Sequence, residues 1–393
     1  MRVAILQRLA TRTPLGWRQL RHNPMRLAVA LAGVAFANAL MFMQLGVMGA
    51  LFESSAKPAR MFKADILLMS PLARSIGDAG TLPRRRLYQA LGVDGVKSGA
   101  AVQLGNIGIR NETGKLQANV LVYGVDPDFD TFVPREIYAQ MPLIRTADTA
   151  LLDRLTRVTL KPMVDALMRG EQPRPELAGR TVTMTGLFSL GASFQNDGTL
   201  IMSDQTYLRL FPRNSASAVS MILLQVEPGA DIEAVAARIR EQIGSSDMQV
   251  STLEGYAEYI KGFMRKHTPI GFIFTFGVVI AMIIGFAIVY QILSADVNDH
   301  LSEYATFKAM GYSHGYLLGV VFEEAFLLAA FGFLPGLLLT IGLYAILSAG
   351  TDLAMDMPLS RALLVLGLTF VMCALSGAVA TRRLRAADPA DVF

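Results

Sequence analysis

The sequence predicts a membrane α-helical protein with four transmembrane helices and a large α+β domain inserted between the first and the second. Two observations predict this class. Of the 393 residues, 52% are hydrophobic and only 17% are charged, and the mean hydropathy is +0.40, which is too apolar for an ordinary soluble protein. The apolar residues also form four long runs, each long enough for the roughly 20 helical residues that cross a bilayer core.

These runs divide the chain into spans and intervening segments. The four expected spans are residues 27–52, 269–293, 317–347 and 362–381. The other segments are a basic N-terminal segment (1–26), the α+β domain (53–268), a segment between the second and third spans (294–316), a short loop (348–361) and a C-terminal tail (382–393).

The basic residues predict which side of the membrane each segment faces. Arginines without any acidic residue precede the first span, namely Arg2, Arg8, Arg12, Arg18, Arg21 and Arg26. Positive charge beside a span is retained in the cytoplasm, so we expect a cytoplasmic N-terminus and, after an even number of spans, a cytoplasmic C-terminus. The loop between spans two and three does not support this orientation, because it offers Lys308 against Asp296, Asp299 and Glu303.

The first run has two interpretations. A cleaved signal peptide is the alternative to a span, but its apolar stretch exceeds the roughly 7 to 15 residues of a signal sequence. Asn38 and Gln44 interrupt this run. Amides inside a membrane usually face another helix, where they form hydrogen bonds, so we expect these two side chains to serve packing.

The long polar stretch reads as a mixture of strands and helices, large enough for two subdomains. Strands are expected at 65–68, 101–109, 119–125, 181–187 and 217–226, and helices at 84–91, 231–243 and 253–263. The segment Glu171–Gly179 is either an internal linker or an ordinary loop. Ser189–Thr199 reads as turns rather than as an active-site loop, and Arg84–Arg86 as a solvated charge run rather than a site for anionic lipid.

The sequence contains no recognisable catalytic or metal-binding pattern. The single cysteine, Cys373, lies in the fourth run, and the four histidines are dispersed, so no zinc motif is present. The segment Gly92–Ser98 has the wrong spacing for a phosphate-binding loop. The pI near 9.2 is explained by membrane orientation, and we expect no nucleic-acid partner and no cofactor bound by this chain.

Two acidic residues fall inside the third apolar run. Glu323 and Glu324 lie roughly 10 Å into the span at about 1.5 Å per residue, which is within reach of the headgroup region. Carboxylates inside a membrane are costly and often functional. Interfacial or structural roles are favoured here over a path for protons, and both remain open.

The segment between spans two and three reads as a short helix from Asp296 to Tyr312 that ends near Gly311. A helix held between two spans cannot move independently of them, so it is suited to act as a lever for a soluble partner. The alternative is a simple connector lying on the lipid headgroups.

Several stretches resemble one family of permeases. They are YATFKAMGYS (304–313), ADPADVF (387–393), AFANALMFMQL (35–45), RRRLYQALGVDGV (84–96), GLFSLGASFQNDGTLIMSD (186–204) and LLGVVFEEAFLLAAFGFLPG (317–336). Together they are similar to the FtsX-like, MacB-type permeases of type VII ABC transporters, and most similar to the DevC branch, the permeases of glycolipid exporters. Glu323 departs from the pattern, in which a neutral residue or an amide is expected.

The resemblance implies a homodimer in the bacterial inner membrane, with a periplasmic domain and no catalysis by this chain. A separate ATPase subunit, which binds ATP and Mg²⁺, would dock on the coupling helix; a periplasmic adaptor and a TolC-like outer-membrane duct would complete the export path. The implied ATPase-coupling residues are Asp299, Glu303, Tyr304, Phe307, Lys308, Met310, Gly311 and Tyr312.

Two other functions remain as alternatives. One is a non-transporting regulator that uses the same motion to switch a periplasmic cell-wall hydrolase. The other is a membrane-bound enzyme, which the absence of a catalytic pattern in the sequence disfavours. No motif identifies the cargo.

Overall fold

The computed structural model describes residues 24–56, 61–73, 79–110, 116–128, 132–191, 193, 195–244, 246–301, 303, 306, 310, 314–351 and 355–381. The chain divides into two compact units. We call residues 1–50 and 269–393 the membrane unit, and residues 51–268 the α+β domain. Within the described residues, four helices are long and apolar enough to cross a membrane.

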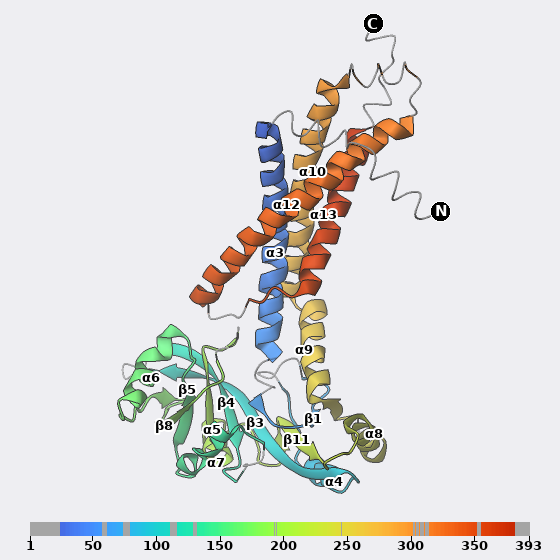
Figure 1. The fold of residues 1–393 in the computed structure, drawn as a ribbon. Helices are drawn as coiled ribbons and strands as arrows, with labels where there is room; N and C mark the ends of the chain where they lie inside the picture. The colour runs from blue at the N-terminus through green and yellow to red at the C-terminus, as the bar shows by residue number, and fades with distance from the viewer. Residues whose placement is uncertain are drawn as a thin grey trace. The chain divides into compact units, whose positions relative to one another are not determined.

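The helices of the membrane unit run side by side (Figure 1). They are α3 (Pro24–Ala56), α10 (Pro269–Asp299), α12 (His314–Thr351) and α13 (Leu359–Ala380). Each contains the apolar core of one expected span and extends beyond it at one or both ends. Hence the fold class predicted from the sequence, four spans with one large inserted α+β domain, is confirmed.

The largest difference from the expected boundaries is at the end of α10. The helix continues to Asp299, six residues beyond the expected end of the span, because Ser294, Asp296 and Val297 are buried against neighbouring helices. The first residues of the expected coupling helix are therefore the last turn of α10. Among the described residues that follow, Leu301, Glu303 and Thr306 are helical and Met310 lies in a turn.

The four helices pack through two groups of apolar side chains. One group lies toward the end of the unit that carries residues 300–313, which we call the linker end; it includes Ala30, Val34, Val297, Val321 and Ala325. The other, around Met41, Phe42, Phe333 and Val365, lies toward the opposite end. Both combine residues from helices distant in sequence.

Glycines bring α3 and α12 close together. A Cβ atom at Gly336 would lie 2.9 Å from the carbonyl oxygen of Ala35 and 2.8 Å from Cβ of Asn38. A Cβ atom at Gly332 would lie 2.6 Å from a methyl carbon of Val34. Because no larger residue fits this distance, the contact between these two helices depends on small side chains, as is common in membrane bundles.

The α+β domain contains the following described elements. Its strands are β1 (Ile66–Met69), β2 (Leu82–Pro83), β3 (Val96–Arg110), β4 (Leu116–Val125), β5 (Thr149–Asp153), β6 (Glu176–Leu177), β7 (Arg180–Thr181), β8 (Thr183–Phe188), β9 (Gly198–Ser203), β10 (Ala218–Val219), β11 (Met221–Val226) and β12 (Gln249–Thr252). Its helices are α4 (Arg85–Leu91), α5 (Arg135–Tyr138), η2 (Met141–Ile144), η3 (Val158–Leu160), α6 (Lys161–Met168), α7 (Asp204–Leu210), α8 (Ile232–Ile243) and α9 (Leu253–His267).

One mixed sheet runs through the domain in the order β12-β1-β11-β3-β4-β9-β5-β8. The long strand β3 pairs with β11 through its first half, from Val96 to Val102, and with β4 through its second half, up to Arg110. The pairs β4–β9 and β5–β8 are parallel and the other pairs are antiparallel. β3 thus connects the two ends of the domain.

A separate hydrophobic cluster lies on each half of this sheet. Leu87 of α4 and Val235 and Ile239 of α8 pack on β1, β11 and β12, whereas Val164 of α6 and Tyr207 of α7 pack on β3, β4, β5, β8 and β9. α4 and α8 lie at one end of the domain and α6 at the other (Figure 1).

The segment Glu171–Gly179 belongs to the second half of the domain and does not separate two folding units. Leu177 is fully buried, and β6 pairs with both β3 and β7. The N–H of Met184 also donates to the carbonyl of Pro173. Of the two interpretations of this segment, the ordinary loop is therefore the one that agrees with the structure.

Candidate functional site

The two amides of α3 face other helices of the bundle. Asn38 is fully buried, and its side-chain oxygen accepts a 2.6 Å hydrogen bond from the hydroxyl of Thr369 on α13. Gln44 lies against α10 at Gly277, where an added Cβ would lie 2.5 Å from Cδ of the glutamine. Both side chains therefore tie α3 to a neighbouring helix, which agrees with a packing role.

Charged side chains from three helices meet at the linker end. Arg26 of α3 contacts two acidic residues near the end of α10: its Nη2 lies 2.6 Å from Oδ2 of Asp299 and its Nη1 lies 3.8 Å from Oδ1 of Asp296. His300 follows directly, with its Nδ1 3.7 Å from the same Oδ1 of Asp296. We call Arg26, Asp296, Asp299, His300 and Glu324 the linker-end cluster.

Glu324 brings α12 into this cluster. Its side chain is fully buried and that of Asp296 is nearly so, and the two carboxyl groups lie within hydrogen-bonding reach of each other. Among the described residues, no donor reaches either oxygen of Glu324 or Oδ2 of Asp296. The polar side chain that reaches Glu324 from another helix is therefore another acid.

The burial of Glu324 separates the two glutamates of α12, for which the sequence predicted the same role. An interfacial position describes Glu323 better, because it is half-buried. Glu324 instead points into the bundle, where carboxyl groups are rare and mark functional sites. The sequence could not show this contact, since Asp296 and Glu324 lie on different helices.

Only part of the expected ATPase-coupling segment lies in the described residues. Asp299 belongs to the linker-end cluster, and Glu303 and Met310 are exposed. The other five residues of the prediction are outside the described part of the chain: Tyr304, Phe307, Lys308, Gly311 and Tyr312. The ATPase-docking role of all eight remains a prediction.

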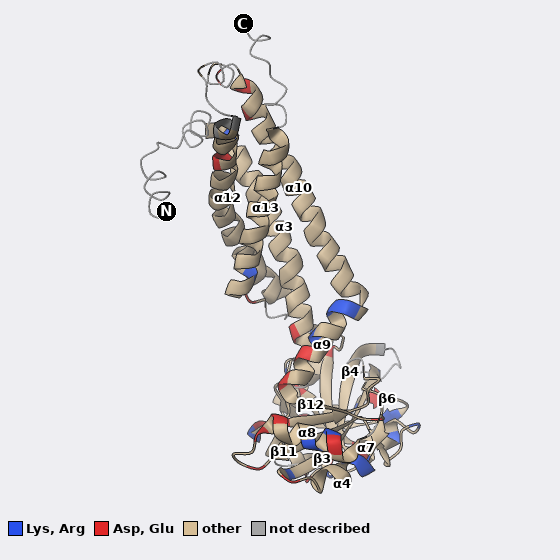
Figure 2. Ribbon diagram, turned by 90° about the vertical axis from the view of Figure 1, so that its right-hand side faces the viewer, with Lys and Arg blue, Asp and Glu red and all other residues tan. Residues whose placement is uncertain are grey.

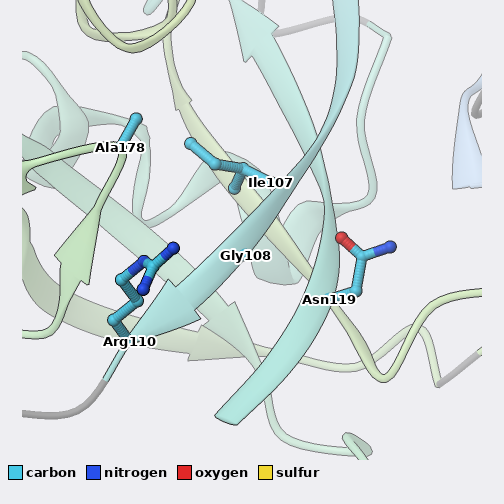
Figure 3. Close-up of a pocket in the computed structure, with 5 residues that line it drawn as sticks. All are labelled: Ile107, Gly108, Arg110, Asn119 and Ala178. Carbon is cyan, nitrogen blue, oxygen red and sulfur yellow. The ribbon is translucent and has the colours of Figure 1, made fainter. Parts of the chain in front are cut away.

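The α+β domain has a shallow hollow of about 340 Å³ at the edge of β3 and β4, lined by Ile107, Gly108, Arg110, Asn119 and Ala178. Figure 3 shows Arg110 and Ala178 on one side of β3 and Asn119 projecting from β4 on the other. The lining of this hollow offers one guanidinium, one amide and aliphatic groups. None of these is a nucleophile or a general base. Within the described residues there is also no group of three metal-ligating side chains.

The arginine run at α4 is only partly solvated. Arg85 is exposed, but Arg86 is buried and forms a bidentate contact with Asp247, with hydrogen bonds of 3.1 and 2.9 Å. For Arg86 the expected solvated role is therefore wrong, because its planar guanidinium fits this carboxylate and joins α4 to the chain after α8.

The segment Ser189–Thr199 is organised by a buried acid that the sequence did not single out. Asp153, at the end of β5, is fully buried. Its carboxylate accepts hydrogen bonds from the N–H groups of Leu155, Leu190 and Gly191 at 3.0, 3.0 and 2.7 Å. These contacts serve structure and leave the expected assignment as a turn in place.

Within the α+β domain, the last turns of α3 are tied to α9. The ammonium group of Lys261 lies 2.8 Å from the carboxylate of Glu53 and 3.0 Å from that of Glu258. Burial opposes the charge on Lys261, but the hydrogen bonds to the two glutamates outweigh it, and the pKa of Lys261 is raised above its ordinary value. A charged lysine thus holds the two helices that lead into the membrane unit.

Comparison with solved structures finds low-identity likenesses that cover about half of this chain. The periplasmic region of MacB from Actinobacillus actinomycetemcomitans matches at 13% identity with a TM-score of 0.34, over 51% of this chain and 95% of that one. The extracellular domain of the noncanonic ABC-type transporter YknZ from Gram-positive bacteria matches at 14% identity and 0.32, over 48% and 100% of the two chains. A domain of a putative permease protein from Porphyromonas gingivalis matches at 15% and 0.28, over 48% and 86%.

Two protein families match the sequence itself, whereas no curated protein does. Residues 27–242, more than half of the chain, match the MacB-like periplasmic core domain. Residues 275–389, which contain the linker end, match the FtsX-like permease C-terminal domain. The two matches follow one another along the chain and together include all four apolar helices and most of the α+β domain. The chain therefore belongs to the MacB/FtsX-like family of ABC transporter permeases.

Proposed function

We propose that this chain is the permease subunit of an exporter of the DevC type, in which a separate ATPase moves the α+β domain through the membrane unit. The ATPase binds ATP and Mg²⁺ and docks on residues 299–312 on the cytoplasmic side. The permease works as a homodimer in the bacterial inner membrane with both termini in the cytoplasm, and the α+β domain lies in the periplasm.

The linker-end cluster is the observation that carries this proposal. Arg26, Asp296 and Glu324 connect α3, α10 and α12 within a few ångströms of one another. Residues 300–313, where the ATPase would push, join α10 to α12 directly. A displacement of this segment is thus passed to three spans together rather than to one helix.

The remaining length of the spans favours force transmission over conduction. Figure 2 shows charged residues at the ends of the long helices and in the α+β domain, with little charge between. A passage for a polar cargo through the bundle would need polar groups along its length. The substrate is instead taken up outside the membrane unit, as a lipid or glycolipid, and delivered through an adaptor and a TolC-like duct.

The continuity of the chain supplies the route to the outer domain. α3 is one helix whose residues up to Ala50 belong to the membrane unit and whose last turn, from Leu51, belongs to the α+β domain. The Glu53–Lys261 ion pair then joins this turn to α9. Helix α9 precedes α10 with only Thr268 between them.

Capture of the ATPase tests the proposal. The full-length permease with Glu303, Phe307 and Lys308 all replaced by alanine should reach the membrane in normal amounts yet lose co-purification of a nucleotide-hydrolysing partner. A matched variant replaces Glu233, Tyr88 and Lys97, three exposed residues of the α+β domain, and should retain it. Equal capture by both variants would contradict docking at this segment.

The identity of the outer partner decides between export and regulation. Crosslinking of the intact protein in cells should join the α+β domain to an adaptor of the membrane-fusion type. Crosslinking to a cell-wall hydrolase in its place would refute export and indicate the non-transporting regulator, with the same ATPase-driven motion.

A further inference from the structure

The contact between Asp296 and Glu324 has a chemical requirement that the relay of force does not explain. Each carboxylate can only accept hydrogen bonds, and in the described residues no N–H or O–H group reaches either oxygen of Glu324 or Oδ2 of Asp296. Two carboxylates in contact in an apolar bundle cannot both be ionised, because like charges and loss of hydration both disfavour the second charge. A proton between them removes both costs.

The surrounding charges show which acid keeps the negative charge. Asp296 faces the guanidinium group of Arg26 from α3 and the imidazole of His300, which follows α10 directly. Glu324 faces Asp296 and the neighbouring Glu323, and no cation within the described residues contacts it. α13, which packs against both helices, has Arg361 as its only charged residue, in its first turn at the opposite end. Asp296 is thus the carboxylate and Glu324 the acid.

We propose that Asp296 and Glu324 form a proton-binding site between α10 and α12. Glu324 carries one proton and donates it in a hydrogen bond to Asp296. On release the proton passes to water, Glu324 becomes a carboxylate, and repulsion from Asp296 separates the two helices where residues 300–313 begin and end. The site goes beyond force transmission, because it makes the packing of the linker end depend on pH whether or not an ATPase binds.

Infrared spectroscopy of the purified full-length protein in lipid nanodiscs tests this directly, because the carbonyl band of a protonated carboxyl group is separate from the bands of carboxylates. Wild type should show this band near pH 7 and lose it reversibly as the pH rises. Glu324→Gln should abolish the band. The absence of a protonated-carboxyl band in wild type near pH 7 would overturn the proposal even if no variant folds.

Matched variants separate this site from its neighbours. Glu323→Gln makes the same change one residue away and should leave the band in place, as should His300→Gln, which removes the imidazole beside Asp296. A band that persists in Glu324→Gln would assign the proton to another group and overturn the site.

Thermal melting gives a second readout that does not depend on the ATPase. A proton bound in the folded state and released on unfolding makes stability decrease as pH rises. The melting temperature of wild type and of Glu323→Gln should therefore fall from about pH 6 to about pH 9 more steeply than that of Glu324→Gln, whose amide donates to Asp296 at every pH. Parallel curves for the three proteins would contradict a proton held at Glu324.

Discussion

Two fully buried acids, one in each unit of the molecule, have opposite surroundings. Asp153 in the α+β domain accepts three backbone N–H hydrogen bonds. Its charge is therefore stabilised by donors that belong to the backbone. Glu324 in the membrane unit faces a second acid, and no described donor reaches it. The first arrangement holds one conformation, whereas the second changes with a single proton.

The same contrast extends to the rest of each unit. The α+β domain holds Asp153 with backbone hydrogen bonds and Arg86 with the bidentate contact to Asp247, and its cores are built around a continuous sheet. The membrane unit relies on close contacts at small residues such as Gly336 and on few polar groups, among them Asn38 and Glu324. The difference teaches that the α+β domain fixes its buried acid with its own backbone donors, whereas the membrane unit leaves a buried acid that no described donor reaches.

The largest expected effect concerns Asp153 in the α+β domain. Asp153→Ala leaves three N–H groups without an acceptor, which should destabilise the α+β domain by about 4 kcal/mol and lower its melting temperature by roughly 10 °C. Differential scanning calorimetry of the full-length protein measures this. The exposed control Asp94→Ala should change little; equal melting of both variants would contradict the structural role of Asp153.

Close packing in the membrane unit should give the next largest effect. Gly336→Ala places a methyl group against the backbone of Ala35. Because a backbone cannot relieve the clash by a change of rotamer, we expect the free energy of unfolding to fall by about 2 kcal/mol. Gly342→Ala is the control on the same helix, since no atom lies within 4 Å of its added Cβ. Unfolding of the two variants in mixed micelles should differ; the same stability for both would argue against the α3–α12 contact.

Titration of a buried tyrosine tests the core of the α+β domain. Burial raises the pKa of Tyr207 to about 12, although the hydrogen bond from Asn214 opposes this; in the unfolded chain it is about 10. The stability contributed by the neutral phenol is therefore complete below about pH 10 and is lost as the pH rises toward 12.

The variant Tyr207→Phe should lose about 1 kcal/mol, because the bond from its hydroxyl to the carbonyl of Leu104 disappears. Its stability should also decline less between pH 10 and 12 than that of wild type. Denaturation followed by circular dichroism at several pH values measures both effects. An identical alkaline decline in wild type and variant would refute the assignment.

The smallest effect is expected at the ion pairs of the surface. Lys261→Met removes the partner of Glu53 and Glu258, yet the side chains of these glutamates are 47% and 65% exposed, so stability should change by less than about 1 kcal/mol. Melting at low and high salt measures this, and the difference should shrink as salt screens the pair. A loss of several kcal/mol would show that this contact, rather than the buried polar groups, holds the domain together.

Much of the fold could be predicted because apolar runs and alternating strands leave clear local signals. The end of α10 was missed because the apolar run stops at Leu293 and Asp296 was assigned to the start of a separate helix, although contacts with other helices bury Ser294 and Asp296. The strands β5 and β9 were missed because they are buried on both faces and show no alternation. β3 was expected to begin at residue 101 rather than at Val96, since VKSGA is polar and rich in small residues.

The linker-end cluster could not be predicted from spacing, because it joins α3, α10 and α12. Its signal was nevertheless present in the charges. The loop between spans two and three held too many acids for its expected side of the membrane. In the structure Asp296 and Asp299 belong to the end of α10 rather than to a loop, both pair with Arg26, and Asp296 is buried. An imbalance in loop charge can therefore indicate a buried contact.

The central claim is that motion at residues 299–312 reaches the α+β domain through the membrane unit. Spin labels at Lys97→Cys in the α+β domain and Ser360→Cys in the membrane unit, with Cys373→Ser, report this motion in the permease reconstituted with its ATPase. We predict that trapping ATP changes the distance between the labels, and that the Glu303, Phe307 and Lys308 triple alanine variant abolishes the change. If residues 299–312 are unchanged and the distance distribution between the labels is still the same with and without trapped nucleotide, the account is contradicted.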